Sequence, residues 1–247
     1  MKELWTEIQN NLQFVVVCIL IVVGLALLAR LAEHFFPEKR KVSAARRVSI
    51  IGICAAIATV LHIFDFPLPF IAPGFYKLDF SELPVLLCGF FLGPSAAVVT
   101  EGIKIFLKLI IKSTSTAFVG DLANFVVGCS FILPAVIIYH VHKSRHSALI
   151  GLIVGTLSMT VLGSAFNAVY LIPAFAQMFI PGPMSAAEKL QSILDMGTQV
   201  HPSVNSLTTF VLLCVAPLNL IKGAVVSLLT MLLYKKVARP LFGIHNK

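Results

Sequence analysis

A long apolar stretch near the end of the chain, residues 206–234, is interrupted at its middle by Pro217, Asn219 and Lys222. As one helix it would be about 40 Å long at about 1.5 Å per residue, more than the roughly 30 Å hydrocarbon core of a bilayer. The pattern therefore predicts a tilted membrane-spanning helix that carries an amide and an ammonium group within the membrane.

Asn219 and Lys222 lie three residues apart, so they share one face of this helix. A lysine at bilayer depth costs about 2.5 to 3.5 kcal/mol on insertion scales, and such residues are usually functional. Two interpretations follow. Either the two side chains contact a ligand in a wet cavity, or they tether the helix, with Lys222 ion-paired to another helix and Asn219 bonded to backbone.

Six further apolar stretches predict membrane helices, which makes seven spans in all. The first, residues 12–29, follows a net negative start unlike that of a secretory signal, so it predicts a retained anchor helix, with a cleaved signal as the alternative. A charged linker follows over residues 30–47, where Pro37 breaks any continuous helix. The remaining spans are residues 48–63, 78–92, 94–112, 118–140 and 148–175, with Gly93 and Pro94 dividing two of them.

Two loops stand out between the spans. Residues 65–77 hold three prolines and a glycine among aromatic residues, which excludes a helix and predicts an extended or hairpin-like loop at the membrane surface. This loop either packs over helix ends or forms a lid that touches a ligand. Residues 177–204 are polar and predict a surface loop with a short helix over residues 186–196.

Charged residues at helical spacing occur in two other spans. Glu101, Lys104 and Lys108 share one face and predict an internal ion pair. Asp121 and Asn124 lie near the start of the following span. Asp121 has a favourable position for the helix dipole, and Asn124 is a candidate ligand contact on the same side.

Two more polar pairs have local interpretations. Asn167 and Tyr170 are again three residues apart, and an amide with an amphipathic ring either supports a helix contact or grips a planar polar molecule. Asp79 and Ser81 are candidates to cap the helix that follows them.

Composition supports a membrane protein, because 58% of the residues are hydrophobic, 12% are charged and the mean hydropathy is +0.94. The net charge of +8 reflects basic residues gathered in the linker 30–47, the loop 139–148 and the tail from residue 235. By the positive-inside rule, this asymmetry predicts an external N-terminus and a cytoplasmic C-terminus, and nucleic-acid binding is not expected.

Cysteine and histidine spacing predicts no metal site. Each of the five cysteines lies in an apolar run, so neither a disulfide framework nor a zinc site is expected. His140, His142 and His146 lie with Lys143 and Arg145 in a short segment that we predict to be a solvated basic loop. The cysteines are Cys18, Cys54, Cys88, Cys129 and Cys214.

The predicted orientation brings the aromatic loop and polar groups of three helices to the outer side. Such a pocket suits a small planar molecule with an imide edge, which pairs with amides and a lysine while an aromatic ring stacks on its face. The phosphate-cradling pattern GxxxxGK[ST] does not occur in the sequence, so ATP-driven uptake would need partner subunits. Neither is a nucleophile paired with a base at catalytic spacing.

Five sequence blocks occur in a familiar order: YKLDFSELPVLL (76–87), GFFLGPSAAVVTEGIKIFLK (89–108), STSTAFVGDLANFVVG (113–128), NAVYLIP (167–173) and APLNLIKGAVVS (216–227). Together they resemble the substrate-binding (S) component of energy-coupling-factor (ECF) vitamin transporters, and within it the riboflavin branch. The resemblance covers residues 48–234.

The resemblance implies an all-α, polytopic membrane helical bundle with a six-helix core, here with one extra N-terminal transmembrane helix. It implies that riboflavin is the transported ligand, without a bound cofactor or metal, and that the bundle docks in the bilayer on a transmembrane coupling subunit driven by two ATPase subunits. We divide the chain into residues 1–47, the extra helix and linker, 48–238, the binding domain, and 239–247, a cytoplasmic tail.

The same resemblance, together with the spacing argument for Tyr170, gives a set of candidate ligand contacts. These are Tyr76, Lys77, Leu78, Asp79, Asn124, Asn167, Tyr170, Asn219 and Lys222. The small-residue face that docks the coupling subunit in this family reads here as Gly52 with Ala56 and Ala55 with Thr59.

Two rival hypotheses remain open from the sequence. The chain could be a related carrier for a different vitamin or precursor base. Alternatively, it could be an intramembrane enzyme that uses Asp121, Glu101 or Lys222.

Overall fold

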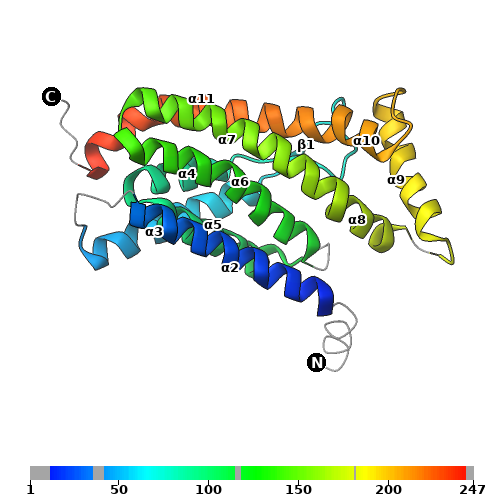
Figure 1. The fold of residues 1–247 in the computed structure, drawn as a ribbon, viewed down its shortest axis with the longest axis horizontal. Helices are drawn as coiled ribbons and strands as arrows, with labels where there is room; N and C mark the ends of the chain where they lie inside the picture. The colour runs from blue at the N-terminus through cyan, green and yellow to red at the C-terminus, as the bar shows by residue number, and fades with distance from the viewer. Residues whose placement is uncertain (1–11, 36–41, 115–117, 181, 243–247) are drawn as a thin grey trace.

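A computed structural model describes residues 12–35, 42–114, 118–180 and 182–242. The apolar stretches form an elongated bundle whose helices run side by side along its long axis (Figure 1). In chain order its main helices are α2 (Leu12–Phe35), α3 (Ala44–Ile63), α4 (Glu82–Leu92), α5 (Pro94–Lys112), α6 (Val119–His142), α7 (Arg145–Phe166) and α11 (Ala216–Phe242). The predicted all-α bundle is therefore confirmed.

Two of the long helices pass through a π-helical segment. α7 continues through η1 (Asn167–Leu171) into α8 (Ile172–Phe179), and α10 (Leu207–Phe210) continues through η2 (Val211–Val215) into α11. A proline follows each π segment, at Pro173 and Pro217. Because proline has no N–H, the carbonyl four residues earlier loses its α-helical partner, and that carbonyl lies inside the π segment in both cases.

The loop between α3 and α4 is a hairpin. β1 (Phe66–Pro67) pairs antiparallel with β2 (Lys77–Leu78), which confirms the extended, hairpin-like structure predicted for residues 65–77. The later polar loop contains α9 (Ala186–Val200), which begins with a capping box formed by Ser185 and Glu188. In Figure 1, α8, α9 and α10 lie together at one end of the bundle.

The predicted boundaries of the charged linker are wrong. α2 runs to Phe35, and α3 begins at Ala44 with Ser43 as its N-cap, so both helices extend into the range 30–47. Arg30 and Glu33 therefore lie in α2, and Arg46 and Arg47 lie in α3. Arg47 and Glu33 approach each other to 3.7 Å. Pro37 lies outside the described residues.

Helix length and apolar composition support four of the seven predicted spans. Within the described residues, four helices are long and apolar enough to cross a membrane: Ala44–Ile63, Val119–His142, Arg145–Met178 and Leu207–Tyr234. α4 has 11 residues, about 17 Å at 1.5 Å per residue, which is too short to cross alone. The break before α5 is at Gly93 as predicted, and its φ of +100° favours glycine.

The core of the bundle surrounds α6, which contacts α4, α5 and α7. Its central cluster includes Phe90, Phe131, Leu152 and Met159, all buried. α2 packs on α5 and α6, where Ala29 is fully buried. The extra N-terminal helix is thus part of the packed structure.

Glycines let α7 approach α6 closely. A Cβ atom at Gly151 would lie 2.5 Å from the backbone oxygen of Ala135, and one at Gly155 would lie 2.5 Å from that of Phe131. Backbone oxygens within a helix have little freedom to move, so a methyl group at either position forces the two helices apart.

We therefore expect Gly151→Ala to destabilise the bundle by about 1 to 3 kcal/mol through overpacking. Gly52→Ala is the matched control, because no atom lies within 4 Å of a Cβ built at Gly52. Thermal unfolding in detergent should show a lower melting temperature for Gly151→Ala and little change for Gly52→Ala. Equal melting temperatures would contradict the close approach of α6 and α7.

Candidate ligand-binding site

A cavity of about 210 Å³ lies beneath the hairpin, among residues of the hairpin loop, α5, α6, η1 and α11. Most of the predicted ligand contacts line it, so groups distant in sequence meet as the sequence predicted. These residues are Tyr76, Lys77, Asp79, Asn124, Asn167, Asn219 and Lys222.

Leu78 and Tyr170 lie elsewhere. Leu78 is buried in β2, where it pairs with Phe66. Tyr170 packs beside Phe166, with ring centroids 5.4 Å apart. The predicted shared face of Asn167 and Tyr170 is not formed, because a π segment turns through a smaller angle per residue than an α-helix does.

The amide side chains of the cavity differ in their hydrogen bonds. Asn167 Oδ1 accepts a bond of 2.7 Å from the Tyr76 hydroxyl, and its Nδ2 donates to the Gly163 carbonyl. Asn124 Nδ2 donates to the Gly120 carbonyl over 3.1 Å. Asn219 Nδ2 is buried and has no hydrogen-bond partner among the described residues. The backbone bond predicted for Asn219 is therefore not made by its Nδ2 among the described residues.

Lys222 is ion-paired with two carboxylates. Its Nζ lies 3.0 Å from Asp79 Oδ2 and 2.9 Å from Glu82 Oε1. The tether interpretation is thus confirmed for Lys222, although the residue also lines the cavity. The lysine holds α11 to the start of α4.

These groups belong to a larger cluster of buried ionisable residues, which we call the buried ion cluster. Lys104 pairs with Glu101 at 2.5 Å, as the spacing predicted, and approaches Glu82 at 3.6 Å. His62 Nδ1 lies 3.4 Å from Asp79 Oδ2. The members of the cluster are His62, Asp79, Glu82, Glu101, Lys104 and Lys222.

The sequence analysis missed Glu82 and His62. Two lysines within apolar spans require carboxylates nearby, and this requirement was a signal that could have identified Glu82. Ser81 was predicted to cap α4, but its hydroxyl makes no capping bond and instead accepts one of 2.9 Å from Lys104 Nζ. The Ser81 hydroxyl therefore bonds to the buried ammonium group of Lys104 and does not cap the start of α4.

A separate ion pair closes another side of the cavity. Asp121 Oδ1 lies 2.6 Å from Lys108 Nζ, and both residues line the cavity. Asp121 Oδ2 is buried without a hydrogen-bond partner among the described residues. Asp121 therefore neutralises Lys108 through Oδ1, and its Oδ2 is a hydrogen-bond acceptor without a donor among the described residues.

Aromatic rings gather on the hairpin side. The Phe75 and Tyr76 ring centroids are 4.8 Å apart, and Phe75 meets Phe175 edge-on at 6.0 Å. Both Phe75 and Tyr76 line the cavity. The site thus combines aromatic faces with amide hydrogen-bonding groups, the makeup of a site for a small planar molecule.

Comparison with known proteins identifies the family of this chain. Residues 46–234 match the family model for the substrate-specific component of ECF transporters. The chain belongs to this family. It is 32% identical to the riboflavin transporter RibU of Staphylococcus aureus over 78% of this chain and 90% of that protein. It is 30% identical to the riboflavin transporter FmnP of Bacillus subtilis over 78% and 92% of the two chains.

A solved structure of the S component of a bacterial ECF transporter has the same fold. The TM-score is 0.61, with 31% identity, over 81% of this chain and 99% of that one. The protein is therefore a multi-pass membrane protein and a component of a transporter.

In this S component, the predicted docking face on α3 is only half open. Ala55 and Thr59 are buried, and Thr59 Oγ1 lies 3.4 Å from the Lys104 carbonyl on α5. Gly52 and Ala56 are exposed. The second of the two predicted pairs packs inside the bundle, because α3 must cover α5 and the buried lysine on it.

We expect Lys222→Met to destabilise the unliganded S component by about 3 to 5 kcal/mol, because it leaves buried carboxylates without their partner. Lys112→Met is the matched control, since Lys112 is exposed and pairs at the surface with Asp65; it should cost at most about 1 kcal/mol. Thermal unfolding without ligand measures both. Similar melting temperatures for the two variants would show that the Lys222 ion pairs contribute little.

Proposed function

We propose that this S component captures riboflavin in the cavity beneath the hairpin, on the outer side of the cell membrane. A transmembrane coupling subunit and two ATPase subunits then drive delivery to the inside. The names of its relatives support the ligand, and family membership supports the partners. The gathering of basic residues in three segments supports an external N-terminus and a cytoplasmic C-terminus.

The observation that carries the proposal is the unpartnered amide of Asn219 in a cavity that two other amides also line. An imide edge alternates carbonyl acceptors with an N–H donor, and an asparagine side chain offers both complementary groups. A buried donor without a partner costs about 1 to 3 kcal/mol, which ligand binding would recover. Asn124 and Asn167 extend the same chemistry around the cavity.

The cavity volume supports a lid function for residues 65–77. About 210 Å³ is less than the roughly 300 to 1,000 Å³ typical of small-molecule sites, so the site must widen to hold a flavin. The hydrogen bond from Tyr76 to Asn167 fastens the loop across it. On the other side, His201 Nε2 lies 3.1 Å from the Ile71 carbonyl, which ties the loop to the end of α9. Breaking the Tyr76 bond would open the entrance.

Residues 48–238 form the binding domain in this proposal, with residues 1–47 and 239–247 outside it. Gly52 and Ala56 are the exposed small residues proposed to meet the coupling subunit. Leu78 and Tyr170 do not line the cavity, so in this proposal they support its wall and do not contact riboflavin directly.

The test is direct binding of riboflavin to the purified full-length chain. We expect quenching of riboflavin fluorescence on titration, and a raised melting temperature by mass action in proportion to the logarithm of ligand concentration. Thiamine and biotin serve as controls for the alternative of another vitamin. If riboflavin gives no quenching while another vitamin raises the melting temperature, the ligand assignment is wrong and the carrier alternative holds.

Asn219→Leu separates binding from stability. We expect the affinity for riboflavin to fall by about 10- to 100-fold, as for loss of a buried hydrogen bond of about 1.5 to 3 kcal/mol. The stability of the unliganded protein should be unchanged or higher, because the variant removes an unpartnered buried donor. Calorimetric titration and thermal unfolding measure the two effects.

The matched control is Asn205→Leu, a change at an exposed position before α10. It should leave riboflavin affinity unchanged. If both variants bind riboflavin as the unaltered chain does, Asn219 is not a ligand contact.

A further inference from the structure

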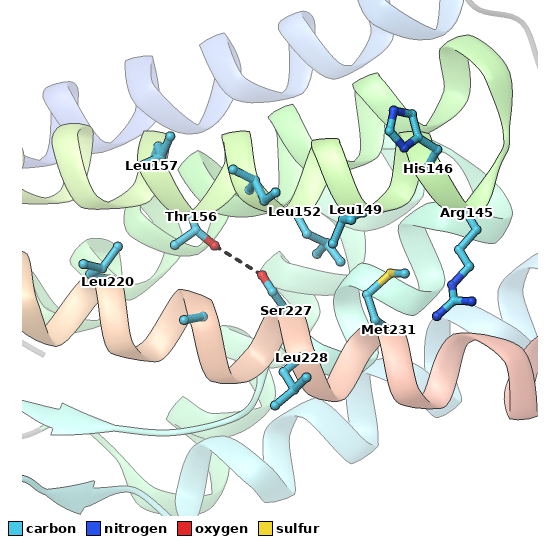
Figure 2. Close-up of a pocket in the computed structure, with 12 residues that line it drawn as sticks. Arg145, His146, Leu149, Leu152, Thr156, Leu157, Leu220, Ser227, Leu228 and Met231 are labelled. Atoms are coloured by element: carbon cyan, nitrogen blue, oxygen red, sulfur yellow. Dashed lines mark hydrogen bonds between the residues drawn. The ribbon is translucent and has the colours of Figure 1, made fainter.

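A second cavity, of about 770 Å³, lies in a groove between α7 and α11 and shares no lining residue with the ligand cavity. Exposed apolar side chains from both helices form its rims (Figure 2). Leu149 and Leu157 come from α7, and Leu220 and Leu228 come from α11. The groove therefore faces outward from the bundle.

Small residues at the crossing of the two helices make the groove. A Cβ atom at Gly223 would lie 2.7 Å from Thr156 Cγ2, so the helix backbones approach closely there. The Thr156 and Ser227 hydroxyls bond to each other over 3.2 Å (Figure 2). Because these hydroxyls satisfy one another, the floor of the groove requires no polar partner, and its walls are apolar.

One end of the groove is basic. Arg145 and His146 line it, and both are exposed. Figure 2 shows Arg145 extending from the start of α7 towards α11, beside Met231. Arg145 makes no ion pair within the described part of the chain, and the groove lining described there includes no acidic residue. The N–H groups at the start of α7 add partial positive charge at the same end.

The length of the groove matches one leaflet of a bilayer. From Arg145 to Leu157, α7 rises about 18 Å at 1.5 Å per residue, slightly more than half of the roughly 30 Å hydrocarbon core. Arg145 would then lie at the headgroup level, with the apolar groove running toward the bilayer centre. A basic end joined to an apolar groove of this length is complementary to an anionic lipid.

We propose that the groove between α7 and α11 binds one anionic glycerophospholipid, with its phosphate on Arg145 and one acyl chain along the groove. A phosphodiester accepts hydrogen bonds from a guanidinium in a bidentate geometry, and an acyl chain fills the apolar space between the rims. The site is independent of the ligand that the S component transports.

The test is native mass spectrometry of the full-length chain, delipidated in detergent and titrated separately with phosphatidylglycerol and phosphatidylcholine. We expect one tightly bound phosphatidylglycerol and a preference of about 5-fold or more over phosphatidylcholine, as for about 1 kcal/mol per basic residue. Arg145→Gln should remove this preference. Arg46→Gln, an exposed arginine near the start of α3 and outside the groove, is the matched control and should preserve it.

A second variant tests the apolar part. Ala224 lines the groove and is exposed, so Ala224→Trp fills the groove without altering the core. It should weaken binding of both lipids, while the melting temperature of the lipid-free protein reports that the fold is intact. Equal binding of the two lipids, or equal effects of Arg145→Gln and Arg46→Gln, would overturn the proposal. Lipid binding insensitive to Ala224→Trp would also overturn it and leave the groove to another occupant, such as a helix of a partner protein.

Discussion

Neutralising charge inside an apolar bundle is the constraint on which this structure depends. A lone ion in hydrocarbon is so costly that each must find partners on other elements. The buried ion cluster joins α3 and the hairpin to α4, α5 and α11 through His62, Asp79, Glu82, Lys104 and Lys222. Since Asp79, Glu82, Lys104 and Lys222 each have more than one partner, the positions of these elements are determined together.

The ligand cavity lies directly against this cluster, and the two have different chemistry. Lys222 forms ion pairs with Asp79 and Glu82. Asn219, three residues away on the same helix, has a buried amide donor without a partner among the described residues. Charged groups therefore stabilise the wall of the cavity, and Asn219 leaves an amide donor beside them without a partner. This division explains how a membrane protein combines buried charge with a preformed polar cavity.

Irregular helix segments shape the remaining walls. The π segment η1 directs Asn167 into the cavity and turns Tyr170 away, toward Phe166. The second π segment, η2, occupies the equivalent place before α11, and both precede a proline that removes a backbone donor. At Gly223 the backbones of α7 and α11 cross closely, and an apolar groove lies between these two helices on the outside of the bundle.

The sequence by itself determined the helical bundle, the hairpin at residues 65–77, the break at Gly93 and the polar residues that line the cavity. These features depend on local preferences of proline and glycine and on apolar runs, which act over a few residues. Only the tertiary structure decided that Lys222 pairs with Glu82, 140 positions away, that Ala55 and Thr59 are buried, and that Tyr170 packs against Phe166. Such outcomes depend on distances between packed helices and on a local change of helical twist, and no spacing along the chain specifies either.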